Sequence, residues 1–127
     1  MVSGGFDPIH PGHVRLFEEA KRLGDKLIVV INNDHWIRAK KGHGFMSAKD
    51  RAEVISSFRY VDKVVIFDND IELIEQIRKF DPDIFVVGSD YKDKKVIGAE
   101  YARQLIYFDK IGGYSSSRII ESKTNNS

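Results

Sequence analysis

Residues 1–31 read MVSGGFDPIHPGHVRLFEEAKRLGDKLIVVI and contain a strand, a glycine-rich turn, a helix and a second strand. Met1–Ser3 supply the end of the first strand, and Leu27–Ile31 form a short apolar run rich in β-branched residues. Between them lies a helical pattern that ends at Gly24, because glycine commonly ends a helix. Its apolar positions are Val14, Phe17, Ala20 and Leu23. This order predicts a parallel α/β sheet.

Three further apolar runs continue the alternation of strand-length segments with helical ones. They are Val64–Phe67, Ile84–Val87 and Leu105–Phe108. Their apolar residues are continuous, which suits strands of a parallel sheet covered on both faces. We therefore predict a Rossmann-like, doubly wound parallel sheet of five strands in a three-layer α/β/α sandwich.

Two more helices are expected between these strands. Ser47–Asp50 resembles a capping box and opens a helix. The apolar stripe of that helix includes Ala48, Ala52, Ile55 and Phe58. Asp70 opens the other helix, which Asp81-Pro82 closes. Its apolar residues at helical spacing are Ile71, Ile74 and Ile77.

The end of the chain is predicted to form one more helix and a tail. Ser115 or Ser116 caps a helix running to about Glu121. The domain then spans residues 1–121, and the polar residues 122–127 form a flexible tail. At the other end, Met1–Ser3 is a very short opening for a strand, which leaves open whether further residues precede it.

The bulk composition excludes several classes of protein. A chain of 127 residues is expected to be one domain, and its net charge of +1 does not indicate a nucleic-acid partner. Without cysteine it has no disulfide, no thiolate nucleophile and no cysteine-based zinc site. No apolar run is long enough to insert into a membrane, and no secretion signal is apparent. We expect a cytoplasmic enzyme or binding domain.

The segment Gly4–His13, GGFDPIHPGH, carries the strongest functional signal. It places His10, His13 and a run of backbone N–H groups at the start of a helix, where phosphate is favoured. Imidazole donors can stabilise a phosphate whose charge grows during a reaction. Gly12 lies between the histidines and has no Cβ to block a ligand. The segment predicts a nucleotide-phosphate site.

Two other interpretations of the histidines compete with a phosphate site. One histidine can simply cap the helix or form a hydrogen bond in the core. Alternatively, two histidines on one helical face can chelate zinc, but such a site needs a third and usually a fourth ligand. His35 and His43 lie in a polar loop at no recognisable ligand spacing, so no metal site is predicted.

In its context the segment Phe6–His13 resembles the signature of the cytidylyltransferase-like nucleotidyltransferases, a His-x-Gly-His motif between the first strand and the first helix. The resemblance covers nearly the whole chain. Arg59–Asp62 is similar to a segment of glycerol-3-phosphate cytidylyltransferases, and Tyr114–Ile119 is similar to a late family motif. Gly88–Lys92, followed by Gly98, is closer to the adenylyltransferase domain of ADP-heptose synthases.

The resemblance implies attack by a phosphate monoester on the α-phosphorus of a nucleoside triphosphate, with release of pyrophosphate. His10 and His13 would stabilise the charge that develops during transfer. The nucleotide would be bound by residues at three strand ends. They are Gly5, Phe6, Gly12, Gly88, Asp90, Tyr91, Ser115, Ser116 and Ser117.

The resemblance also implies roles for polar residues outside these motifs. A lysine that reaches the phosphates of both substrates is Lys40 by the cytidylyltransferase pattern and Lys41 by the ADP-heptose pattern. Arg51 matches an arginine common to these enzymes, and Trp36 lines the acceptor pocket or packs in a dimer. Asp7 is placed to orient the substrate loop.

Three functions are carried forward from the sequence. The first is adenylyl transfer from ATP to a heptose-type sugar 1-phosphate. The second is cytidylyl transfer from CTP to glycerol 3-phosphate or a related alcohol phosphate. The third is a nucleotide-binding domain without turnover. An enzyme of this family is expected to use Mg²⁺ with its triphosphate and to form a homodimer. The residues named so far do not decide the base, the acceptor, the pathway or the host.

Overall fold

The computed structural model describes residues 1–6, 9, 11–33, 46–88, 95–108 and 117–120. The strands are β1 (Val2–Gly4), β2 (Ile28–Asn32), β3 (Lys63–Phe67), β4 (Ile84–Gly88), β5 (Gln104–Phe108) and β6 (Ser117–Ile120). The helices are α1 (Pro11–Arg22), α3 (Ala48–Ser56), α4 (Asp70–Phe80) and the 3₁₀ helix η2 (Ala99–Tyr101). In these described ranges, no helix is both long and apolar enough to cross a membrane.

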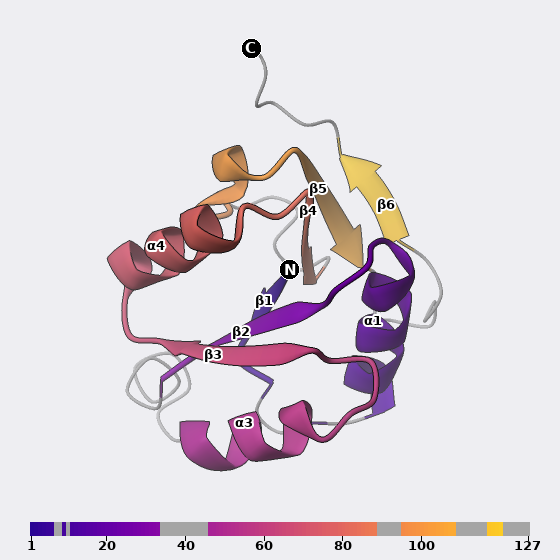
Figure 1. Cartoon of the computed structure of the whole chain (residues 1–127), viewed down its shortest axis with the longest axis vertical. Coiled ribbons are helices and arrows are strands. Elements are labelled where there is room, and N and C mark those ends of the chain that lie inside the picture. The colour runs from indigo at the N-terminus through magenta and orange to yellow at the C-terminus, as the bar shows by residue number, and fades with distance from the viewer. Residues whose placement is uncertain (7–8, 10, 34–45, 89–94, 109–116, 121–127) are drawn as a thin grey trace.

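The strands form a single sheet with the order β3-β2-β1-β4-β5-β6 (Figure 1). Strands β1 to β5 are mutually parallel, which confirms the predicted doubly wound sheet. The chain winds from β1 outward to β3, then returns to the other side of β1 and winds outward again. The strand order therefore reverses between β1 and β4, and ligands of such sheets bind beyond the carboxyl ends of the strands at that point.

Helices cover both faces of the sheet and give the predicted three layers. On one face, Leu16 and Phe17 of α1 and Ile55 of α3 pack against alternate residues of the strands. On the other face, Leu73 and Ile77 of α4 pack against the remaining set. Figure 1 shows α1 and α3 on one side of β1 and β2, with α4 on the other. We refer below to the α1 face and the α4 face.

The predicted C-terminal helix is wrong. Residues Ser117–Ile120 form β6, which pairs antiparallel with β5 and adds a sixth strand to the five that were expected. Ile119 and Ile120 are β-branched and suit a strand, and their backbones lie opposite Ile106 and Leu105. Pairing satisfies the backbone groups along the open edge of β5, and a helix could not do so.

The apolar stripes of two helices also differ from the expectation. Leu23 lies just after the end of α1 and is exposed, whereas His13 and Leu16 of α1 are buried. In α4, Ile71 is 70% exposed, whereas Leu73 joins Ile77 in the core. The prediction is correct for Phe17, Ala20 and Ile77, which are buried, and wrong for the exposed Leu23 and Ile71.

The helix starts follow the predicted capping chemistry with one shift. Ser47 caps α3, and its Oγ accepts a hydrogen bond of 3.1 Å from the Asp50 N–H. Asn69, rather than Asp70, caps α4, and its Oδ1 accepts from the Glu72 N–H at 2.9 Å. Asp70 is therefore the first residue inside the helix.

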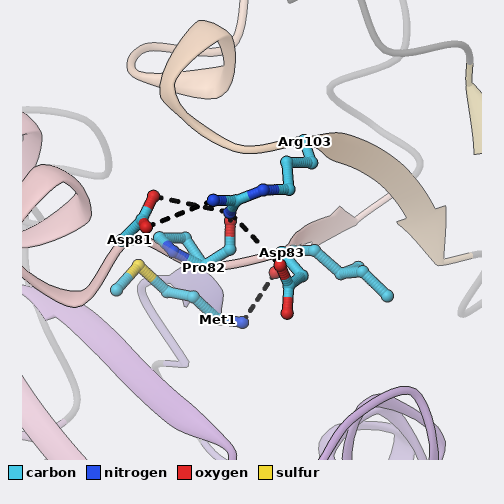
Figure 2. Close-up of polar contacts among 6 residues, drawn as sticks. Met1, Asp81, Pro82, Asp83 and Arg103 are labelled. Carbon is cyan, nitrogen blue, oxygen red and sulfur yellow. Dashed lines mark hydrogen bonds and ion pairs between the residues drawn. The ribbon is translucent and has the colours of Figure 1, made fainter.

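Charged residues that directly precede β4 and β5 join the amino ends of these two strands (Figure 2). This is the edge of the sheet opposite the switch point. Arg103 bridges the carboxylates of Asp81 and Asp83, each with an N···O distance of 3.2 Å. The nearby Met1 amine donates to the Ile84 carbonyl at 2.8 Å, and the Met1 residue is only 8% exposed. Burial lowers the pKa of this amine from 8.0 to about 6, although the Asp83 charge acts in the opposite direction.

For the 127-residue chain with a free Met1 amine, this shift predicts a pH dependence of stability. Between pH 8 and pH 6 the unfolded chain binds a proton at its amine while the folded chain does not, so the free energy of unfolding falls as the pH falls. Two pKa units correspond to about 3 kcal/mol, and the loss levels off below pH 6. Urea unfolding of the 127-residue chain at pH 8, 7 and 6 measures it.

The matched control is the same chain acetylated at its amine, which has no such group to titrate. The acetyl group shifts stability equally at every pH, so the difference in slope isolates the amine. Equal slopes for the acetylated and the free chain would show that the Met1 amine does not titrate as described.

Candidate active site

The segments predicted to bind nucleotide end at the carboxyl edge of the sheet. β1 runs into the Gly4–Phe6 turn at the switch point, and β4 ends at Gly88. Gly88 pairs with Phe108, and Phe108 pairs with Ser117 at the start of β6. The structure thus brings Gly88 and the backbone of Ser117 to the same edge as the turn after β1. Ser117 is there as a strand residue and not at a helix start, so the predicted helix N-terminus around it is wrong.

The Gly4–Phe6 turn has an unusual backbone that its side chains hold in place. Phe6 has φ 54°, in the left-handed region that residues with a side chain seldom adopt. The residue is 6% exposed, and its ring packs against Gly4, where an added Cβ would lie 2.8 Å from the ring. Burial of the ring offsets the backbone strain, and position 4 must be glycine to leave it room.

His13 lies near the start of α1 and packs against Phe6 of this turn. It is 7% exposed, and its ring meets the Phe6 ring edge to face, with centroids 5.0 Å apart at 88°. The Phe17 ring also packs against the Phe6 ring, with centroids 5.3 Å apart. The packing therefore orients the imidazole.

The helix that carries His13 has an N-terminus suited to an anion. Pro11 is its first residue, and no acidic side chain lies in its first turn. The partial positive charge of the helix end is therefore not neutralised by carboxylates of that turn. Gly12 is buried in the same turn. This is the environment expected of a phosphate-binding helix start.

Arg51 of α3 forms a hydrogen bond to the turn after β1. It is fully buried, and its Nη1 donates to the Gly5 carbonyl at 2.8 Å, while its Nε donates to the Met46 carbonyl at 3.2 Å. A guanidinium can bind two carbonyls at fixed angles because its donors form a rigid fork. The sequence placed Arg51 at the substrate, but in the structure these donors hold two backbone segments of the site.

Nine of the residues predicted from sequence lie outside the described ranges. They are Asp7, His10, Trp36, Lys40, Lys41, Asp90, Tyr91, Ser115 and Ser116. Their roles stay predictions.

The Arg59–Asp62 segment lies at the opposite edge of the sheet, because it precedes the amino end of β3. The Asp62 carboxylate accepts from the Lys21 ammonium and from the Leu27 N–H, each at 2.7 Å. These hydrogen bonds, from Lys21 first, hold the pKa of Asp62 below its ordinary value. Asp62 thus joins the segments that enter β2 and β3, and its place in the motif has a structural explanation.

A cavity of about 130 Å³ lies at the carboxyl edge on the α4 face, and the sequence did not predict it. Its polar and aromatic lining includes Ser3, Asn32, Phe67, Asp70 and Lys95. The one available signal was Asn32, a polar residue directly after the apolar run Leu27–Ile31. Among the described residues no cluster of three metal-ligating side chains occurs there or elsewhere.

Comparisons with known proteins agree with this geometry. A family model described as "Cytidylyltransferase-like" matches residues 1–122. The chain is similar to the "Bifunctional protein HldE" of Campylobacter jejuni subsp. doylei, with 46% identity over 95% of this chain and 26% of the relative. The protein of the same name from Helicobacter pylori strain P12 is 42% identical over the same shares. The chain therefore spans about a quarter of the length of these relatives.

A solved structure is also similar. It is the crystal structure of the lipopolysaccharide core biosynthesis protein from Thermoplasma volcanium, with a TM-score of 0.64 and 30% identity. The match covers 71% of this chain and 73% of that one.

The contacts of Arg51 predict that it positions the Gly5–Phe6 turn and, through it, His13. Arg51→Lys keeps the charge and loses the fork, which leaves a carbonyl without its donor and lowers the free energy of unfolding by about 1–3 kcal/mol. The amide resonances of Gly5 and Phe6 and the ring resonances of His13 are expected to shift. Heteronuclear NMR spectra with urea unfolding measure both effects.

Ile55→Val is the matched control, because Ile55 is fully buried on the same helix. It lowers stability by about 0.5–1.5 kcal/mol without removing a hydrogen bond to the turn. If both variants leave the resonances of the turn and His13 unchanged, Arg51 contributes to stability alone.

Proposed function

The chain belongs to the cytidylyltransferase-like family of nucleotidyltransferases, and on this basis we propose that it transfers an adenylyl group from ATP to a heptose-type sugar 1-phosphate. A phosphate oxygen of the sugar forms a bond to the α-phosphorus of ATP. The bond between that phosphorus and the oxygen bridging to the β-phosphate breaks, and pyrophosphate leaves with its electron pair. Such a transfer depends on positioning and on stabilisation of charge.

The observation that carries this proposal is the placement of His13. It lies in the first turn of α1, at the switch point, beneath a turn held by Phe6 and Arg51. A triphosphate at this helix end would meet backbone N–H groups and an imidazole that is already oriented. Donors that need no rearrangement stabilise the charge that develops on the transferred and leaving groups.

Two observations favour ATP and a sugar phosphate over CTP and an alcohol phosphate. The segment that resembles ADP-heptose synthases begins at Gly88, and Gly88 lies at the carboxyl edge. The segment that resembles glycerol-3-phosphate cytidylyltransferases, Arg59–Asp62, lies at the amino edge, where Asp62 has a structural role. The curated relatives reported above are bifunctional proteins, and this chain corresponds to one part of them.

Roles for residues outside the described ranges remain part of the proposal. His10 would act with His13, and Lys40 or Lys41 would bind the phosphates of both substrates. Asp90 and Tyr91 would bind the nucleotide with Gly88, and Ser115 and Ser116 with Ser117. Trp36 would line the acceptor side, Asp7 would orient the loop, and the enzyme would form a homodimer.

We also propose that Mg²⁺ accompanies the triphosphate. Mg²⁺ prefers oxygen ligands and usually keeps several waters while it bridges substrate phosphates, so it does not require a cluster of protein ligands. When bound it neutralises charge on the triphosphate. The protein's own donors, the α1 N-terminus and His13, then act on the charge that remains.

Pyrophosphate release tests the reaction. We expect release with ATP and a heptose 1-phosphate, and little with CTP and glycerol 3-phosphate, measured by a coupled pyrophosphate assay over a panel of both nucleotides and several acceptors. A preference for CTP with an alcohol phosphate would support the second function instead. Nucleotide binding without pyrophosphate release for any pair would contradict the proposal that the protein is an enzyme.

His13→Ala tests the part of the site that the structure describes. Loss of the imidazole is expected to lower kcat on the order of 10²-fold, because a donor to the developing charge is removed. Steady-state kinetics measure it, with circular dichroism to confirm that the variant folds. Ile55→Val is the control, since it removes one buried methyl group on α3 and no polar group of the site. Equal kcat values for the His13 variant and the wild type would remove His13 from the chemistry.

A further inference from the structure

The residue at which the chain leaves β2 is bonded to the end of β3. Asn33 directly follows β2, and its N–H donates to the Phe67 carbonyl at 3.0 Å, which extends the β2–β3 pairing by one step. Its side-chain Nδ2 donates to the Asp68 carboxylate at 2.6 Å. Both the backbone and the side chain of Asn33 are therefore held. We call the hydrogen bond between Asn33 and Asp68 the β2 anchor.

Asp68 is in turn held by α4, which follows β3 directly (Figure 1). The Asp68 N–H donates to the Glu72 carboxylate at 2.8 Å, and the Glu72 N–H donates to Oδ1 of the N-cap Asn69 at 2.9 Å. This is a variant of the capping box, in which a glutamate of the first turn reaches back to a residue before the helix. Since α4 buries Leu73 and Ile77 against the sheet, the acceptor of the β2 anchor has a fixed support.

The β2 anchor lies at the start of a segment that is rich in cations. Residues 34–45, which we call the cationic segment, lie outside the described ranges. They include Arg38, Lys40 and Lys41 but only one acidic residue, Asp34, although the whole chain has a net charge of only +1. The substrates of the proposed reaction carry phosphates, so cations close to the switch point would attract them.

The other end of the cationic segment is also attached to the site. Met46 is the first described residue after the segment, and its carbonyl accepts from Nε of Arg51 at 3.2 Å. The same guanidinium donates to the Gly5 carbonyl in the turn after β1 at 2.8 Å. The cationic segment thus begins at the carboxyl end of β2, next to β1, and ends at a residue that shares a partner with the turn after β1.

Fixed ends make the cations of such a segment more effective. A lysine side chain is flexible, and ordering it against a phosphate costs conformational entropy. A segment with a loose end would add its own backbone entropy to that cost, whereas a segment with both ends fixed has fewer conformations to lose. Charges that are held in place before the substrate arrives also stabilise developing charge better.

We propose that Asn33 and Asp68 are positioning residues, which set the point at which the cationic segment leaves β2 and thereby position its lysines for the substrate phosphates. The inference rests on the proposed function and adds to it two residues that no sequence motif indicated. A purely structural contact would change only the free energy of unfolding. A positioning contact also changes the kinetics, by an amount that depends on the lysines.

An exchange of the two side chains tests the contact. Asn33→Asp places a carboxylate against that of Asp68, so the β2 anchor is lost and kcat/KM for ATP is expected to fall on the order of tenfold. Asn33→Ala removes the donor without adding a charge and is expected to act in the same direction. Combining Asn33→Asp with Asp68→Asn restores a donor and an acceptor in reverse order, and it is expected to recover most of the activity.

Asn69→Asp is the matched control. It adds the same negative charge one residue from Asp68, and aspartate caps a helix as well as asparagine does. Its kcat/KM is expected to stay within about twofold of the wild type, because an exposed charge is largely screened. Urea unfolding of every variant confirms that it is folded under the assay conditions.

A double-mutant cycle tests whether the effect passes through the lysines. In a chain that already carries Lys40→Ala and Lys41→Ala, Asn33→Asp is expected to lower kcat/KM and ATP affinity by less than about twofold, since the groups that it positions are gone. Additive effects of the lysine and Asn33 changes would overturn the inference.

ATP binding separates this inference from the proposed function. If the wild type releases pyrophosphate and Asn33→Asp behaves like Asn69→Asp, the positioning role is wrong and the function stands. If no acceptor gives pyrophosphate release, the function is wrong, and isothermal titration with ATP decides the positioning role. Binding that Asn33→Asp weakens and the exchange restores supports it, whereas equal binding by Asn33→Asp and the wild type overturns it.

Discussion

The hydrogen bond from buried Arg51 to the Gly5 carbonyl joins α3 to the turn after β1, and the geometry of the site depends on it. Without this donor the Gly5 carbonyl would lose its hydrogen bond to Arg51. The left-handed backbone of Phe6, the next residue, would then be less well held. Phe6 in turn orients His13. One guanidinium thus connects α3 to the segment between β1 and α1, which lies 46 residues away in the sequence.

Much of the fold could be predicted from the sequence, because continuous apolar strands and helical spacing are local signals. The five parallel strands and the two-sided covering of the sheet followed from them. The prediction failed where tertiary contacts decide. Ser117–Ile120 pairs with the open edge of β5, and no local sequence pattern predicts this pairing. The exposure of Ile71 depends on which face of α4 packs against the sheet.

The candidate site was predicted in part for the same reason. The motif around His13 is contiguous, so its position at the switch point could be inferred from the order of elements. The contacts of Arg51 and the cavity around Asn32 could not be inferred in this way. Both depend on which segments, distant in sequence, meet in the fold. Conversely, Asp62 belongs to a segment that carried a functional resemblance, and its contacts with Lys21 and Leu27 stabilise the fold.

The sixth strand protects the sheet from pairing with other molecules. β6 covers the outer edge of β5 by antiparallel pairing from Leu105 to Phe108. A chain truncated before Ser117 would expose that row of N–H and C=O groups next to the apolar side chains of Leu105 and Ile106. Bare edges of this kind template pairing between molecules. Deletion of the last strand would therefore favour aggregation, so the C-terminal segment contributes to solubility whatever its part in binding.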